Sequence, residues 1–88
     1  MRRFQFEWDD ENIEHIARHH VSPEEVEEVF RTRFHLMQSR LGRYVALGQT
    51  EAGRYLFCPF ERKGPSLVRV VTARDMEAWE RRLYKRKR

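Results

Sequence analysis

The chain has 88 residues, which suffice for one domain with a small core and exclude a two-lobed enzyme with a large enclosed cofactor site. Aromatic residues make up 12% of the sequence, which argues against a disordered chain. The single cysteine, Cys58, excludes an internal disulfide and a metal site built from several thiolates, and we expect it to fill the core. No apolar stretch follows the two arginines near the N-terminus, so we predict neither a signal peptide nor a membrane span and expect a cytoplasmic location.

The net charge of +4 is unevenly distributed along the chain. Residues 1–30 carry nine acidic and three basic side chains, a net charge of −6, whereas residues 31–88 carry five acidic and fifteen basic ones, a net charge of +10. This polarity favours a basic surface that binds a polyanion. The alternative is a soluble protein with an arginine-rich composition, because fifteen of the eighteen basic residues are arginine.

The first twenty residues predict one strand and one helix. Residues 4–8 alternate between aromatic and polar side chains, a period of two that is typical of a half-buried strand. Asp9 then offers a cap oxygen and acidic residues follow it, so a helix is predicted to begin there. Ile13 and Ile16 recur at helical spacing, and we expect the helix to end near His20, with that side chain half-buried.

Residues 21–26 carry the clearest local signal in the chain. Ser22 is in the position of an N-cap and Pro23 in the first helical position, while Glu25 stands three residues past the cap, where it can complete a capping box. An apolar stripe follows at Val26, Val29 and Phe30. A second helix is therefore predicted to run to about residue 33.

From residue 34 the pattern changes to that of strands. Four are predicted, at residues 34–38, 43–49, 54–61 and 66–73. The short turns between them imply an antiparallel meander. Because Pro59 has no N–H to donate to a neighbour, the third of these strands is predicted to be an edge strand or to carry a bulge.

The C-terminal residues predict a last helix. Asp75 is placed to cap it, and Met76, Trp79 and Leu83 lie at the spacing of a buried stripe. We expect this helix to fray into the basic run at residues 85–88. The order of one strand, two helices, a strand meander and a final helix predicts a single α+β domain over residues 1–88, with helices packed on an antiparallel sheet.

Side chains suited to phosphodiester chemistry occur where the last predicted strand passes into the last helix. Arg69 lies on the strand, Arg74 at the junction, and Glu80 and Tyr84 share one face of the helix. Arginine forks bind phosphate and stabilise transition-state charge, and a carboxylate can accept the proton of a ribose 2′-hydroxyl. These residues favour RNA cleavage, and the alternative is a solvated helix face with ordinary ion pairs.

The histidines and the remaining motifs give weaker evidence for a function. His15 and His19 are spaced to chelate a metal, but no H-E-x-x-H pattern or third ligand accompanies them, so no metal site is predicted. His19 is a candidate general acid or phosphate contact, or else a cation stabilised by the helix dipole. Because the chain lacks a glycine-rich phosphate-binding motif, no cofactor is predicted. Residues 81–88, six of them basic, are typical of a nucleic-acid footprint or of a solubilising tail.

An ordered set of short motifs resembles a known family. The set comprises F-E-W-D at residues 6–9, R-H-H-V-S at 18–22, R-Y-V-A-L-G at 43–48, R-V-V-T-A-R at 69–74 and E-R-x-x-Y at 80–84. It is similar to the BrnT-type toxins and spans nearly the whole chain. Arg18 stands where the family has lysine and His20 where it has glycine. If that glycine adopts a positive φ, His20 is strained.

The resemblance implies a RelE-like fold and a ribonuclease toxin of a type II toxin–antitoxin system. Such a toxin cleaves RNA without a metal, by attack of the ribose 2′-hydroxyl, either on free RNA or on the ribosome. It is neutralised by a cognate antitoxin, and operator DNA is contacted only through that antitoxin. The alternatives are a non-catalytic RNA-binding or degenerate toxin module, and an interaction protein whose acidic helices at residues 9–30 bind a partner.

The resemblance also implies roles for individual residues. The catalytic set carried over is Arg69, Arg74, Glu80, Tyr84 and His19. The two arginines are expected to bind phosphate and stabilise charge. Glu80 is expected to act as base or to orient Arg74, and the other two to serve as leaving-group or base contacts. The expected RNA-binding residues are Arg18, Arg43, Arg54, Arg81 and Arg82.

Overall fold

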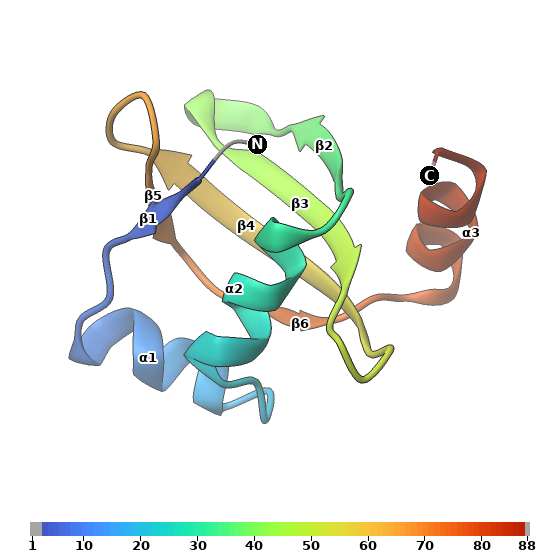
Figure 1. Ribbon diagram of the computed structural model, residues 1–88, viewed down its shortest axis with the longest axis horizontal. Coiled ribbons are helices and arrows are strands. Elements are labelled where there is room, and N and C mark those ends of the chain that lie inside the picture. The colour runs from blue at the N-terminus through green and yellow to red at the C-terminus, as the bar shows by residue number, and fades with distance from the viewer. Residues whose placement is uncertain (1–2, 88) are drawn as a thin grey trace.

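The computed structural model describes residues 3–87, apart from the side chain of Leu41, and shows an α+β fold. The expected order of elements is confirmed (Figure 1). The helices are α1 (Asp10–Ala17), α2 (Pro23–Arg31) and α3 (Ala78–Lys87), with a short 3-10 turn at Arg40–Gly42. The strands are β1 (Gln5–Phe6), β2 (His35–Gln38), β3 (Tyr44–Gln49), β4 (Tyr55–Arg62), β5 (Leu67–Val70) and β6 (Arg74–Asp75).

All six strands join one mixed sheet in the order β1-β5-β4-β3-β2, with β6 also paired to β4. Strands β2 to β5 form the predicted antiparallel meander. The N-terminal strand adds to β5 in parallel, with Gln5 opposite Leu67. Because side chains alternate across a strand, Phe57 and Glu61 of β4 point to one face of the sheet, and Leu56 and Cys58 to the other.

Helices α1 and α2 cover the face that carries Leu56 and Cys58. Ile16 and the stripe of α2 are fully buried there, as predicted for Val26, Val29 and Phe30. Helix α2 lies so close to β3 that a Cβ on Gly48 would stand 2.8 Å from a methyl of Val29, which explains the glycine. Cys58 fills this core as expected, and burial raises the pKa of its thiol to about 12.

The start signals of the first two helices are confirmed. Asp9 caps α1 by accepting from the Asn12 N–H at 3.1 Å, and the Asn12 side chain accepts in return from the Asp9 N–H at 2.8 Å. Ser22 and Glu25 form the predicted capping box, with distances of 3.2 and 3.0 Å. Helix α2 ends at Arg31, two residues before the predicted boundary.

The prediction of an edge position for the strand with Pro59 is wrong, because β4 lies between β3 and β5. The alternative, a bulge in that strand, is also wrong, because β4 pairs with β3 without interruption and the extra residue lies on the opposite chain, between β5 and β6. Two residues of β4 separate Phe57 from Phe60, whereas three residues separate their partners Arg74 and Val70. The carbonyl of Pro59 accepts a hydrogen bond from the Val71 N–H, so Pro59 faces the segment between β5 and β6, where the ladder is interrupted. The N–H that proline lacks would point to the same segment, so a central strand can accommodate the proline here.

The predicted faces and ends of the last helix need correction. Trp79, expected in the core, is 49% exposed, whereas Glu80 and Tyr84 are buried. Asp75 does not cap the helix but lies in β6, and the residue before α3, Glu77, instead donates its N–H to the Glu80 carboxylate at 2.7 Å. The helix continues through Lys87 rather than fraying from residue 85, and residue 88 lies outside the described residues.

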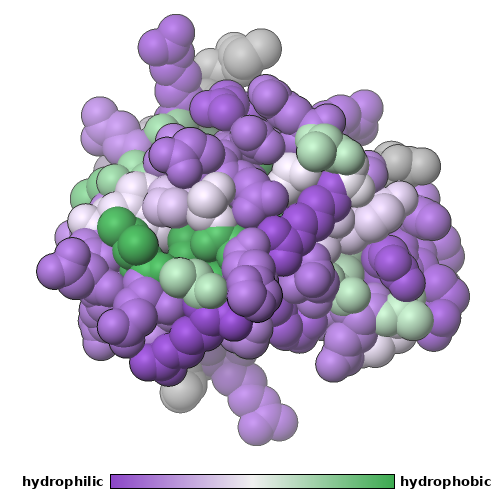
Figure 2. All heavy atoms as spheres, turned by 90° about the horizontal axis from the view of Figure 1, so that it is seen from below, coloured by the Kyte–Doolittle hydropathy of each residue, from purple (hydrophilic) through white to green (hydrophobic). Residues whose placement is uncertain are grey.

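Two further features concern the surface. His20 is exposed rather than half-buried, and it has a φ of 59°, the left-handed conformation that glycine adopts without strain. Seen from below, the surface is mostly hydrophilic with a small hydrophobic area (Figure 2). Among the described residues, no helix has both the length and the apolar character needed to cross a membrane.

Candidate functional site

Arg74 is held in one orientation on the face of the sheet that carries α3. Its guanidinium carbon lies 3.9 Å from the centre of the Phe57 ring, a cation–π contact. Nη1 and Nη2 donate to the two oxygens of Glu80 at 2.9 and 3.0 Å, the bidentate geometry that suits a guanidinium and a carboxylate. These hydrogen bonds raise the pKa of Arg74. Nη1 also donates to the Asp75 carbonyl at 3.0 Å, and the side chain as a whole is still 31% exposed, so Arg74 is oriented but remains partly accessible to solvent.

Glu80 is the buried partner that sets this orientation. It is 1% exposed, and its oxygens accept from Arg74 and from the backbone N–H of Glu77. A carboxylate that is buried and engaged in this way has no oxygen directed to a ribose hydroxyl. Of the two roles expected for Glu80, the geometry favours the orientation of Arg74.

Aromatic rings and exposed cations continue the site along α3. Tyr84 lies one turn after Glu80 and meets the ring of Tyr55 edge to face, with centroids 6.0 Å apart. Arg81 and Lys85 stand over the same Tyr55 ring at 5.9 and 5.4 Å. Arg81 and Arg82, two of the predicted RNA-binding residues, are both exposed on this helix.

Sequence reasoning missed Phe57 and Tyr55, and it included Lys85 only as part of the basic run at residues 81–88. The signals were present, since Tyr55 and Phe57 alternate along one strand and Arg81 and Lys85 are four apart on a helix. They became informative only once the sheet face that carries α3 was known.

Arg54, another predicted RNA-binding residue, connects the turn after α1 to β6. Its guanidinium donates to Asp75 at 2.7 Å, to the carbonyls of His20 and His19 at 2.7 and 3.0 Å, and to Glu25 at 3.2 Å. The pair with Asp75 raises the pKa of Arg54 and lowers that of Asp75. These acceptors belong to the protein itself, so the side chain acts as a brace.

His19 is not brought into the Arg74 cluster. It lies near Asp75, whose pKa is lowered mainly by Arg54 and further by the charges of His19 and His20. In the ladder Asp75 pairs with Leu56, and Arg74 with the next residue, Phe57. Adjacent strand residues point to opposite faces, so Asp75 with its histidines and Arg74 with its glutamate lie on opposite sides of β6.

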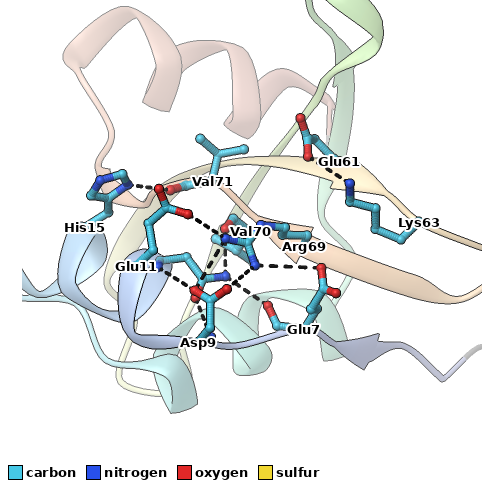
Figure 3. A network of polar contacts seen from close by, with 10 residues as sticks. Glu7, Asp9, Glu11, His15, Glu61, Lys63, Arg69, Val70 and Val71 are labelled. Atoms are coloured by element: carbon cyan, nitrogen blue, oxygen red, sulfur yellow. Dashed lines mark hydrogen bonds and ion pairs between the residues drawn. The ribbon is translucent and has the colours of Figure 1, made fainter.

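Arg69 lies in a separate, acidic cluster (Figure 3). It donates to Asp9 at 2.8 Å and to Glu11 at 3.0 Å, and Glu7 stands 3.7 Å away. The hydrogen bond from Arg69 lowers the pKa of Asp9. Arg69 pairs with Glu61 of β4, and Arg74 pairs with Phe57, four residues earlier on the same strand. The two arginines are therefore about 13 Å apart along the sheet.

The last two predicted RNA-binding residues are in exposed ion pairs. Arg18 pairs with Glu14 at 2.9 Å, and Arg43 pairs with Glu61 at 3.3 Å. Neither lies on α3. The described residues contain no group of three or more histidine, cysteine, aspartate or glutamate side chains arranged to hold a metal ion.

Comparison with known proteins places these features in a family. A family model described as a ribonuclease toxin, BrnT, of type II toxin–antitoxin systems matches residues 8–80 of this chain. The match includes β2 to β6 and the residues that form the Arg74–Glu80 pair. No curated protein matches the chain.

Proposed function

Because the chain belongs to the BrnT family of ribonuclease toxins of type II toxin–antitoxin systems, we propose that it is an RNA endonuclease whose reaction centre is Arg74. One observation carries this assignment. Arg74 is the arginine of the predicted catalytic set that is both oriented by a buried carboxylate and open to solvent. Arg69, by contrast, is 19% exposed and surrounded by three carboxylates.

The proposed reaction is a transesterification within the RNA. The ribose 2′-oxygen bonds to the adjacent phosphorus, the bond from phosphorus to the 5′-oxygen breaks, and the products are a 2′,3′-cyclic phosphate and a 5′-hydroxyl. The proton lost by the 2′-hydroxyl is balanced by the proton that the leaving oxygen gains. Arg74 binds the non-bridging oxygens, on which negative charge develops, and a preset donor performs this without reorganisation. Glu80 is a positioning residue for Arg74.

The exposed cations of α3 extend this centre into a binding surface. Arg81 and Lys85 stand beside the half-buried ring of Tyr55, and Arg82 is exposed on the same helix. Cations that follow a phosphate backbone, next to aromatic rings, are typical of single-stranded nucleic-acid binding. Because the family implies a cognate antitoxin, we propose that the antitoxin neutralises the toxin by covering this surface, and that operator DNA is contacted through the antitoxin alone.

The test is cleavage of a labelled single-stranded RNA by the purified chain in EDTA, which removes divalent metals. Wild type is expected to cut and to leave a cyclic phosphate. Arg74→Ala should lower the rate by at least about 100-fold, the effect of losing one preset charge-stabilising donor. Arg62→Ala removes the same charge from an exposed site at the other end of β4 and should leave the rate unchanged.

Circular dichroism verifies that both variants fold, and Arg74→Lys, which keeps the charge but not the fork, should recover only part of the rate. An undiminished rate in folded Arg74→Ala would refute the assignment. Salt-dependent retention of RNA by wild type without any cleavage would identify the chain as the alternative, a non-catalytic RNA-binding module.

A further inference from the structure

An open pocket of about 510 Å³ lies at the end of the sheet, next to Tyr84. Three other elements contribute polar side chains to its lining. Arg33 comes from the connection between α2 and β2, Gln49 from the end of β3, and Glu51 from the turn between β3 and β4. None of these three residues belongs to the cluster around Arg74.

The pocket is adjacent to the proposed reaction centre. Gln49 pairs with Tyr55 in the ladder, so its side chain points to the face that carries Phe57 and Arg74. On α3, Tyr84 follows Glu80 by four residues, about 6 Å along the helix axis. A nucleotide whose phosphate lies at Arg74 therefore has its base within reach of the pocket.

Opposite charges line the pocket without pairing to each other. Arg33 is exposed, and no ion pair joins it to a carboxylate among the described residues, although Glu51 lines the same pocket. The backbone around them is fixed, since the Glu51 N–H donates to Glu28 at 3.0 Å and the Gln49 amide donates to the Gly53 carbonyl at 3.2 Å. Arg33, a potential donor fork, and Glu51, an acceptor on a held turn, thus line the same opening.

Guanine is the base whose hydrogen-bonding groups match this pair. Its O6 and N7 accept the two hydrogen bonds of an arginine fork, while its N1–H and exocyclic amine donate to an acceptor such as a carboxylate. Adenine presents an amine in place of O6 and has no N1–H. Tyr84 also lines the pocket, but it is 5% exposed, so only a small part of it can contact a base.

We propose that this pocket is a guanine-binding subsite for the RNA substrate, in which Arg33 donates to O6 and N7 and Glu51 accepts from N1–H and the amine. The proposal rests on the proposed function for its substrate, and it adds a base preference that Arg74 alone does not supply. Arg33 and Glu51 are then specificity-determining residues, and Gln49 and Tyr84 shape the pocket.

The first experiment measures binding without cleavage. Guanosine 3′-monophosphate and adenosine 3′-monophosphate are titrated separately into the purified chain and followed by NMR chemical shifts. Guanosine monophosphate should bind at least about tenfold more tightly, the discrimination expected of one bidentate contact. The largest shifts should fall at Gln49, Glu51 and Gly53. Equal affinity, or shifts confined to residues outside the pocket, would overturn the proposal.

The second experiment uses variants with matched controls. Glu51→Gln and Arg33→Ala should each reduce the preference for the guanosine nucleotide to about twofold or less. Glu24→Gln and Arg31→Ala alter exposed side chains of the same charge on α2, outside the pocket, and should keep the preference. A preference that survives Glu51→Gln would refute the role of that carboxylate.

The third experiment separates this proposal from the proposed function. RNA oligonucleotides that differ only by guanine, inosine or adenine at one position are incubated with wild type. The subsite is supported if the RNA is cleaved beside guanine, less beside inosine, which lacks the exocyclic amine, and only weakly beside adenine. Cleavage with no base preference overturns the subsite and leaves the nuclease standing. Guanosine binding in the pocket without cleavage of any oligonucleotide supports the subsite and overturns the nuclease.

Discussion

Arg69 and Arg74 are five residues apart and point to the same face of the sheet, but their surroundings differ. Arg74 has one carboxylate partner, Glu80, which is buried and holds both guanidinium nitrogens in a fixed geometry. Arg69 has three carboxylates around it, each of them substantially exposed. The comparison teaches that the burial and number of an arginine's partners separate a guanidinium held in one orientation, the proposed reaction centre, from a cross-link among exposed carboxylates.

Ion pairs such as those of Arg69 also bear on the uneven distribution of charge along the chain. Carboxylates of the acidic N-terminal part pair with arginines of the basic part, as Asp9 and Glu11 do with Arg69, and Glu25 with Arg54. Part of the charge polarity is therefore used within the molecule, in the ion pairs by which Arg54 and Arg69 join its two halves. Among the described residues, α3 carries a run of exposed cations, Arg81, Arg82, Lys85, Arg86 and Lys87, that no ion pair joins to a carboxylate.

The largest effect is expected from Glu80→Ala, which removes the support of Arg74. It deletes a bidentate partner and the acceptor of the Glu77 N–H, so the free energy of unfolding should fall by about 2 to 3 kcal/mol. Urea unfolding followed by circular dichroism measures this change. RNA cleavage by the folded fraction should fall by about 100-fold, as for loss of Arg74 itself.

Glu77→Ala is the control for that variant, because Glu77 is an exposed neighbour on the same segment. Its stability should change by less than about 0.5 kcal/mol. If Glu80→Ala unfolds at the same urea concentration as wild type, Glu80 does not hold the helix to the sheet.

The second prediction concerns Arg69, the other arginine of the comparison. Arg69→Ala removes a cross-link between β5 and the segment that begins α1, and should lower the free energy of unfolding by about 1 kcal/mol, since the pairs are largely exposed. The cleavage rate at a temperature where the variant stays folded should remain within about twofold of wild type. A loss of rate comparable with that of Arg74→Ala would return Arg69 to the catalytic set.

The third prediction concerns the turn that Arg54 braces. His20 has a φ of 59°, which costs a residue with a side chain more than it costs glycine. His20→Gly should therefore stabilise the protein by about 0.5 to 1 kcal/mol, after allowance for the greater freedom of glycine in the unfolded chain. A raised thermal midpoint would confirm the strain, and a lowered one would show that the imidazole contributes more than the strain costs.

The smallest effect is expected in the response to acid. Arg69 lowers the pKa of Asp9 below its ordinary value of 3.8, so the unfolded chain binds this proton first as the pH falls. The contribution of Asp9 is complete above its unfolded pKa and is lost as the pH drops through the lower, folded pKa. Asp9→Asn keeps a side chain that can cap α1 and should flatten the fall in stability below about pH 4. Unfolding curves from pH 2 to 6 test this, and an unchanged slope would contradict it.

Local signals were sufficient where the interacting residues are close in sequence. The capping box of Ser22 and Glu25, the stripe of α2 and the meander were predicted because their contacts depend on helical spacing or on tight turns. The pairing of Arg74 with Glu80 also spans only six residues, and it lies at the strand–helix junction that the sequence singled out as a candidate site.

Long-range contacts account for what the sequence did not reveal. The partners of Arg54 lie 21 to 35 residues away, so nothing local distinguished a brace from an RNA contact. Hydropathy assigned Trp79 to the core and Glu80 to the solvent side. The structure reverses them because Arg74 and a backbone N–H compensate the buried carboxylate, while the Trp79 indole donates to Glu77 at 3.0 Å.

The parallel pairing of β1 with β5 has a consequence for the order of folding. It joins segments separated by both of the first two helices and by β2 to β4, and the Arg69–Asp9 contact beside it bridges 60 residues of chain. Closing such a long segment costs more entropy than forming the hairpins of β2 to β5, so we expect the N-terminal strand to dock after the meander has formed. By the same reasoning it is the first segment to detach in the native state. The amides of Gln5 and Glu7, which donate to β5 and the residue before it, should therefore exchange with solvent faster than those of β3 and β4.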